Sequence, residues 1–335
     1  MSELIGANPS EIIFTGSGTE ANNLAIKGFF WQHPDRNLIV TSAFEHHAIL
    51  DPVEWLVEHE GAEQVLIPIT KAGVIDLDFL RNIVQTRGSE IAVISIMHSN
   101  NELGSIQPIA EIVKIAGDIP VHTDAVQSFG KVEFDFAALN VTAATISAHK
   151  IGGPLGVAAL ILKRGLDLTP VLHGGGQERE IRSGTLNAPS IVAFTAAAEY
   201  AIANMATNFK KIRELRDYFV TGLKKCVPDV SINSITDPAL PGIVNATFPG
   251  TESDALLLLL DTEGISASAG SACSAGVPRP SHVLVALGLS ESDADASLRI
   301  SIGTTNTKAE IDQVLAILPS VVERARNAFV VSELN

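Results

Sequence analysis

The chain has 335 residues, of which 46% are hydrophobic and 18% are charged, and its formal net charge at pH 7 is −15. This length exceeds the size that one hydrophobic core usually supports, so we expect a globular protein of two domains. The negative charge, with no lysine- or arginine-rich run to offset it, argues against a nucleic-acid-binding or membrane-binding surface.

The first part of the chain alternates short apolar runs with segments of helical spacing. The apolar runs predict strands at residues 11–14, 38–41, 65–69, 91–97, 120–123, 144–147 and 157–162. Helices are predicted between them at residues 20–30, 48–60, 78–87 and 109–116. This alternation is typical of an α/β fold with a mostly parallel sheet and helices on both faces. The strands lack polar alternation, as expected for burial on both sides.

The pattern changes after residue 190. Residues 190–226 have helical spacing with few breakers, which predicts two helices or one bent helix. Further strands are predicted at residues 243–248, 265–267 and 298–302, with helices at residues 252–263 and 308–327. We therefore expect a large domain over residues 1–205 and a smaller α+β domain over residues 206–335.

Lys150 and Asp124 each follow a predicted strand. An amine that forms a Schiff base and a carboxylate that keeps a pyridine nitrogen protonated are the two groups that pyridoxal phosphate requires. The pair alone is a weak signal, because most lysines lie on the surface and many aspartates occupy turns.

Two further segments follow predicted strands and open helices. The turn around Gly18 and Thr19 is rich in glycine and could hold a phosphate with its backbone N–H groups, although such turns often serve geometry alone. His46 could stack on a flat cofactor and relay protons, whereas a lone histidine at this place is more often a helix cap or a surface residue.

Asn101 and Arg299 are candidates for binding a substrate. Asn101 lies in a turn of amides and glycine, where turn chemistry alone explains an asparagine, but its amide could donate to a cofactor oxygen or to a carboxylate. Arg299 lies between Leu298 and Ile300 on a predicted strand. It either faces solvent or grips a carboxylate with its two-pronged guanidinium group.

The two cysteines differ in their surroundings. Cys226 ends an amphipathic helix and is expected to be a buried small hydrophobe. Cys273 lies in a loop of glycine, serine and alanine, where an exposed thiol becomes nucleophilic once deprotonated. Neither a disulfide framework nor a zinc site is predicted, and no signal peptide or membrane span is visible, so we expect a cytoplasmic protein.

Several motifs in chain order carry a resemblance that runs from about residue 3 to residue 327. They are TGSGTEANN, EHHAILD, HSNNELG, HTDAVQS, SAHKIGGPLG, HGGGQEREIRSGT, SAGSACSAG and LRISIG. Together they resemble the cysteine desulfurases, pyridoxal-phosphate enzymes of the aspartate-aminotransferase fold within the class V aminotransferases.

The resemblance implies a role for each candidate residue. Lys150 would form the Schiff base and Asp124 would hold the pyridine nitrogen. Asn101 and Arg299 would bind the substrate carboxylate, and Cys273 would accept sulfur. The remaining contacts to the cofactor would come from His46 stacked on the ring, Gln127 on the phenolate oxygen, Gly18, Thr19, Ser147 and His149 on the phosphate, and Thr185 on the phosphate of a neighbouring subunit.

The implied reaction removes sulfur from L-cysteine. Lys150 would move the α-proton, the Cys273 thiolate would attack the substrate sulfur, and alanine and an enzyme persulfide would result. The sulfur would pass to an acceptor or scaffold protein for iron–sulfur clusters or other thio-cofactors, and the enzyme would be a homodimer.

The chain departs from the family pattern at its start, because it contains nothing like the family's N-terminal Asn-Ala-Ala-Thr-Thr segment. Two alternatives stand beside a cysteine desulfurase, and only the second of them is motivated by this missing segment. One is a selenocysteine lyase or another β-eliminating relative, in which the loop cysteine is less essential. The other is a truncated, non-catalytic paralogue that acts as a partner protein.

Overall fold

The computed structural model describes residues 1–235, 237–270 and 280–333, with the backbone alone over residues 329–333. It divides the chain into two compact units. The large unit comprises Met1–Thr70, Val74–Asn100 and Ile106–Ala206. The small unit comprises Thr207–Asn335 together with two short segments, Lys71–Gly73 and Asn101–Ser105.

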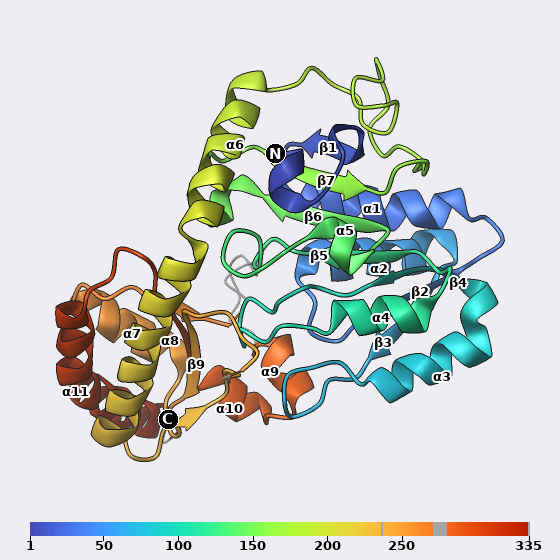
Figure 1. Cartoon of the computed structure of the whole chain (residues 1–335). Helices are drawn as coiled ribbons and strands as arrows, with labels where there is room; N and C mark the ends of the chain where they lie inside the picture. The colour runs from blue at the N-terminus through green and yellow to red at the C-terminus, as the bar shows by residue number, and fades with distance from the viewer. Residues whose placement is uncertain (236, 271–279, 334–335) are drawn as a thin grey trace. The chain divides into compact units, whose positions relative to one another are not determined.

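A seven-stranded sheet forms the centre of the large unit (Figure 1), with strand order β1-β7-β6-β5-β4-β2-β3. β7 is antiparallel to both of its neighbours, and every other pair is parallel. All strands except β7 therefore point the same way, which confirms the mostly parallel sheet. The strands are β1 (Ile12–Thr15), β2 (Leu38–Ser42), β3 (Glu63–Ile67), β4 (Ile91–Ser95), β5 (Val121–Asp124), β6 (Ala143–Ser147) and β7 (Ala158–Leu162).

Helices cover both faces of this sheet. The chain crosses toward the β3 edge through α1 and α2 and returns through α3, α4 and α5. Because crossovers between parallel strands are right-handed, the first two helices lie on one face and the other three on the opposite face (Figure 1). The helices of this unit are α1 (Gly18–Gln32), α2 (His47–Glu60), α3 (Leu77–Arg87), α4 (Ile109–Ala116), α5 (Phe136–Leu139) and α6 (Ala188–Ala203).

Burial explains which strands were easy to predict. β2, β4, β6 and β7 are buried along their whole length. The edge strand β3 is largely accessible, and it begins two residues before the predicted run. One apolar core joins α1 and α2 to the sheet, through residues such as Leu24, Phe29, Ile49 and Val93.

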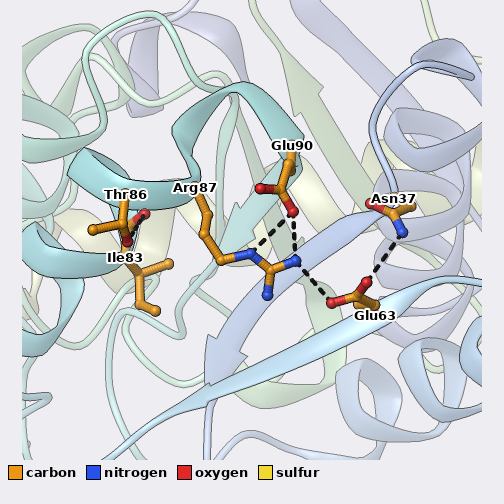
Figure 2. Close-up of polar contacts among 6 residues, drawn as sticks. All are labelled: Asn37, Glu63, Ile83, Thr86, Arg87 and Glu90. Atoms are coloured by element: carbon orange, nitrogen blue, oxygen red, sulfur yellow. Dashed lines mark hydrogen bonds and ion pairs between the residues drawn. The ribbon is translucent and has the colours of Figure 1, made fainter.

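The accessible edge at β3 carries a small ionic network (Figure 2). The guanidinium group of Arg87, at the end of α3, donates to Glu90 and, at 2.8 Å, to Glu63 at the start of β3. Asn37 donates to the other oxygen of Glu63 at 3.4 Å. The hydrogen bond and charge of Arg87 lower the pKa of Glu63. This network fastens the end of α3 to the edge strand, and charged side chains on an exposed edge also discourage pairing with other chains.

The small unit is built on a four-stranded antiparallel sheet, with order β10-β11-β9-β8. A separate apolar core lies between this sheet and its helices, with Phe219, Phe248 and Val321 fully buried. The elements are α7 (Met205–Cys226), β8 (Ser231–Ile232), β9 (Ile243–Thr247), α8 (Ser253–Thr262), β10 (Ser268–Ala269), α9 (His282–Leu287), α10 (Glu291–Asp295), β11 (Ser297–Ser301) and α11 (Lys308–Glu333).

The structure decides one sequence expectation that was left open and corrects another. The long helical segment is two helices, separated at Asn204, whose side-chain amide donates to the carbonyl of Tyr200 at 2.8 Å. The strand predicted at residues 265–267 was wrong: the Ile265 N–H instead bonds the carbonyl of Leu260 and closes the end of α8, and β10 follows it. Among the described residues, no helix is long and apolar enough to cross a membrane.

Candidate active site

The strand directions gather polar side chains at one edge of the large sheet. β1, β2, β4, β5 and β6 all end at this edge, because only β7 runs in the opposite direction. In open α/β sheets, ligands bind outside the carboxyl ends of the strands. The sequence candidates that follow these strand ends are Gly18, Thr19, His46, Asp124, Gln127, Ser147, His149 and Lys150.

Asp124, the last residue of β5, is a buried carboxylate held by two donors. Asn22 on α1 donates from Nδ2 to one carboxylate oxygen at 2.7 Å, and the Val126 N–H donates to the other at 2.9 Å. Burial raises the pKa of Asp124, whereas these two hydrogen bonds and the charges of His46 and Lys150 lower it. Asp124 is thus oriented to accept a further proton-bearing group.

Lys150 lies in the short 3-10 turn Ala148–Ile151 that follows β6. Gly152 ends this turn in the left-handed conformation, with a φ of 81°, which favours glycine. The Lys150 side chain is exposed, and its charge lowers the pKa of Asp124 at the end of the neighbouring strand. An accessible amine and a buried carboxylate are thus placed on adjacent strand ends.

The glycine-rich turn opens α1 close to the end of β6. Ser17 caps the helix by accepting the Glu20 N–H at 3.1 Å. A Cβ atom at Gly18 would lie 3.1 Å from Val126 and 3.7 Å from the Cβ of Ser147, so the lack of a side chain permits this close approach. The first N–H groups of a helix have no partner within it, so this end of α1 suits an anion.

Ser147 and His149 lie beside this helix end. The Ser147 hydroxyl and the His149 Nδ1 are 2.8 Å apart and share a hydrogen bond. Burial and the charges of Lys150 and Lys131 lower the pKa of His149. A neutral imidazole, a hydroxyl and helix N–H groups together form a donor set that fits a phosphate.

His46 and Gln127 are each oriented by a local hydrogen bond. The Nδ1 of His46 accepts the Ala48 N–H at 3.0 Å, so His46 caps α2, as one of the two sequence interpretations expected. The Oε1 of Gln127 accepts from Lys131 at 2.9 Å, which leaves the Nε2 amide group to donate elsewhere.

Asn101 and Arg299 both belong to the small unit. The guanidinium group donates to the Asn101 carbonyl at 3.4 Å and to the Ser268 hydroxyl at 3.3 Å. Arg299 pairs directly with Asn245 on β9, so the two side chains share one face of the sheet. Within the described residues, Arg299 Nε and Asn245 Nδ2 are buried donors with no acceptor. Two buried donors side by side favour an anion, such as a carboxylate.

Thr185 is exposed in the loop before α6. The preceding Arg182 donates to Glu20 at 2.7 Å, which fastens this loop to the start of α1. Cys273 lies outside the described residues.

Sequence reasoning missed three polar residues that lie next to the candidates: Asn22 beside Asp124, Asn245 beside Arg299, and Glu45 before His46. Glu45 is fully buried, accepts from the Ser42 hydroxyl at 2.5 Å and from the Met97 N–H at 2.9 Å, and burial raises its pKa to about 8. Glu45 and Asn22 lie within the quoted motifs, beside other candidates. For Asn245 the available signal was a polar residue between apolar neighbours on a predicted strand.

Comparison with known proteins identifies a matching family and similar relatives. The class-V aminotransferase family model matches residues 1–314. A relative described as an IscS-like cysteine desulfurase, from Mycobacterium tuberculosis, is 46% identical and spans 98% of this chain and 85% of its own length.

Two solved structures extend the comparison. A structure described as a NifS-like protein has a TM-score of 0.88 and 32% identity, over 96% of this chain and 85% of that one. A second, described as SspA in complex with cysteine, has a TM-score of 0.75 and 33% identity, over 91% and 85% of the two chains.

The chain therefore belongs to the class V aminotransferase family. Its fold, a mostly parallel sheet with helices on both faces, agrees with that of the NifS-like structure. Within the family, it is an enzyme of the cysteine desulfurase kind.

Proposed function

We propose that this chain uses pyridoxal phosphate to remove sulfur from L-cysteine, leaving alanine and a persulfide on Cys273. The observation that carries the proposal is the pairing of Asp124 with Lys150 on adjacent strand ends. Asp124 is buried and held by two N–H donors, and the Lys150 amine is accessible and acts on it electrostatically. When bound, the cofactor supplies an electron sink for a carbanion at the substrate α-carbon.

The residues at the carboxyl ends of the strands fit this cofactor. Lys150 would bind the cofactor aldehyde, and Asp124 would hold the ring nitrogen. Gln127 would donate its amide to the phenolate oxygen, and His46 would stack on the ring. The phosphate would be held by Gly18 and Thr19 at the start of α1, by Ser147 and by His149. The close approach of Gly18 to Ser147, which brings the start of α1 beside the end of β6, supports this assignment.

Each remaining residue has one task in the reaction. Arg299 and Asn101 would hold the substrate carboxylate, as the acceptor-free Nε of Arg299 supports. Lys150 would remove the α-proton of the substrate. The Cys273 thiolate would attack the substrate sulfur, so that the S–S bond forms as the C–S bond breaks and the β-carbon of alanine takes a proton.

Absorption and product analysis test this proposal. The purified chain with pyridoxal phosphate is expected to show a visible absorption band and to form alanine from L-cysteine. Borohydride should abolish the band and leave the cofactor covalently attached to Lys150. Lys150→Ala removes both the band and the formation of alanine. Cys273→Ser retains the band but loses alanine formation and the persulfide.

Cys226→Ser is the matched control for Cys273→Ser. Cys226 is half-buried, burial raises its pKa, and its thiol donates to the Leu223 carbonyl, so it is expected to be inert. Turnover that survives Cys273→Ser, or a persulfide that forms on Cys226, would contradict the proposal.

We further propose a homodimer in which Thr185 reaches the phosphate at the neighbouring subunit's site. The exposure of Thr185 supports this arrangement. Mixing Lys150→Ala chains with Thr185→Ala chains tests it, because a mixed dimer holds one site with both residues intact. Recovery of activity is expected, whereas a monomer by light scattering contradicts the arrangement.

The proposal also covers the substrate, the sulfur acceptor and the cellular location. The structure described as SspA in complex with cysteine supports L-cysteine as the substrate. The persulfide sulfur would pass to an acceptor or scaffold protein. A cytoplasmic location fits the proposal, because a reducing compartment returns Cys273 to the thiol between turnovers.

A further inference from the structure

We propose that Asn22 is a positioning residue that keeps Asp124 ionised and oriented toward the ring nitrogen of the cofactor. The inference rests on the proposed use of pyridoxal phosphate at this site. Asn22 was not among the sequence candidates, and it lies 102 residues from Asp124 along the chain. Asn22 would therefore act on the charge of the Asp124 carboxylate and would not itself touch the cofactor.

The geometry places one donor on each carboxylate oxygen. Asn22 Nδ2 donates to Oδ2 of Asp124 at 2.7 Å, and the Val126 N–H donates to Oδ1 at 2.9 Å. Asn22 is 1% exposed and Asp124 is 6% exposed. Each oxygen keeps lone pairs for one further donor, so the carboxylate can still accept a protonated ring nitrogen.

Four groups favour the charge on buried Asp124: the Asn22 amide, the Val126 N–H, and the charges of His46 and Lys150. Burial alone raises the pKa of Asp124 and so favours a neutral carboxylic acid, which would not hold a proton on the cofactor. An amide N–H2 group can only donate, so it stabilises the ionised form. The Asn22 hydrogen bond lowers the pKa of Asp124 in the same direction as the Val126 N–H.

A second observation separates this role from simple packing between α1 and β5. The Oδ1 of Asn22 is buried and has no hydrogen-bond partner among the described residues. A buried carbonyl oxygen without a donor is unfavourable, and an apolar side chain of the same size would avoid it. The asparagine is therefore explained by its Nδ2 donor and not by the space that it fills.

The isosteric variant Asn22→Asp provides the sharpest test. The new carboxyl group can donate to Asp124 only while it is protonated, so the donor is present at low pH and lost as the pH rises. We expect the dissociation constant for pyridoxal phosphate to approach the wild-type value at acidic pH. At alkaline pH we expect it to exceed that of the wild-type protein by about ten- to a hundredfold, the range for hydrogen bonds to charged groups.

Two further variants bracket this result. Asn22→Leu removes the donor at every pH, so we expect weaker cofactor binding throughout, without recovery in acid. Asn22→Ser restores a donor at every pH and is expected to recover part of the affinity. Asn82→Asp makes the same change at an exposed position on α3, which carries none of the candidate residues, and should leave the pH profile unchanged.

The outcomes separate the inference from the proposed function. If the wild-type chain binds no pyridoxal phosphate, the proposed function fails first and the inference falls with it. If the wild-type chain binds it and forms alanine, but Asn22→Asp gives a profile parallel to wild type or to Asn22→Leu, the inference alone is overturned. A loss of melting temperature without a pH-dependent change in cofactor affinity would show that Asn22 serves packing only.

Discussion

The Nε of Arg182 donates to Glu20 at 2.7 Å, and the other carboxylate oxygen of Glu20 accepts the Gly16 N–H at the same distance. Glu20 thus joins the glycine-rich turn to the loop that carries Thr185. Both side chains are less than one-third exposed, at 17% and 25%, so solvent screens this ion pair only in part. One carboxylate therefore holds both the turn proposed to contact this chain's phosphate and the loop whose Thr185 is proposed to reach the neighbouring subunit's phosphate.

We expect Arg182→Met to loosen this loop. Hydrogen exchange of residues 176–187 should become faster, and pyridoxal phosphate should bind about tenfold more weakly, as one lost charge-assisted hydrogen bond predicts. Arg179→Met is the matched control, because the Arg179 side chain bonds the carbonyls of Ser10 and Leu166 at the surface and does not contact the turn. Equal effects of the two substitutions would contradict the role given to Glu20.

Glu45 should make the stability of the folded chain fall as the pH rises. Its pKa in the folded state is about 8, against an ordinary value of 4.5. The folded state therefore binds the proton more tightly, so this contribution is complete below pH 4.5 and is lost as the pH rises through about 8. Chemical denaturation from pH 4.5 to 9 should show a loss of about a few kcal/mol from this group.

Glu45→Gln should remove this slope, because an amide keeps an oxygen for the Met97 N–H and does not ionise. Glu54→Gln, at an exposed position on α2, should retain it. An unchanged slope in Glu45→Gln would mean that Glu45 is ionised in the folded protein across this range.

The main elements of the fold could be predicted because burial leaves a direct record in the sequence. Strands such as β2 and β4 are mostly apolar, with polar residues only at their carboxyl ends, and helical spacing marks the segments between them. The reversed direction of β7 left no such record, because a buried strand is apolar whichever way it runs. The break at Asn204 was left open for a related reason, since asparagine is tolerated inside helices and also ends them.

The site could be predicted only where a residue stands beside a recognisable motif. Asn101–Ser105 belongs to the small unit through contacts made by residues much later in the chain. The Ile235 N–H bonds the Leu103 carbonyl at 3.0 Å, and the Leu240 N–H bonds the Gly104 carbonyl at 2.8 Å. Asn245 likewise gains its meaning only from its register opposite Arg299. Pairings of this kind depend on three-dimensional register and have no periodic signal.

Gly242 should be essential for the small unit. A Cβ atom there would lie 2.1 Å from the Ile302 carbonyl oxygen and 2.8 Å from the side chain of Ile212, and the Ile302 N–H bonds the Gly242 carbonyl at 2.8 Å. Gly242→Ala must therefore displace the end of β11, and we expect it to lower the free energy of unfolding by about 2 kcal/mol or more. Denaturant titration measures this loss.

Gly88→Ala is the control for overpacking. A Cβ atom at Gly88 would lie 3.6 Å from Ile119, an ordinary van der Waals contact, and its φ of −56° suits any residue. This substitution should change the stability by less than about 1 kcal/mol. A similar loss in both variants would mean that the backbone at Gly242 moves aside without strain.

Arg299 should govern the affinity for the substrate carboxylate and leave the cofactor untouched. Its guanidinium group is already held by Asn101 and Ser268, and its buried Nε has no acceptor among the described residues. Arg299→Lys keeps the charge but loses the planar pair of donors, so we expect KM for L-cysteine to rise about tenfold, and more for Arg299→Leu. The dissociation constant for pyridoxal phosphate should stay at the wild-type value in both. Arg324→Lys, at an exposed ion pair with Glu263, is the matched control and should change neither quantity. An unchanged KM in Arg299→Leu would mean that the buried donors of Arg299 and Asn245 serve the small unit's own structure and not the substrate.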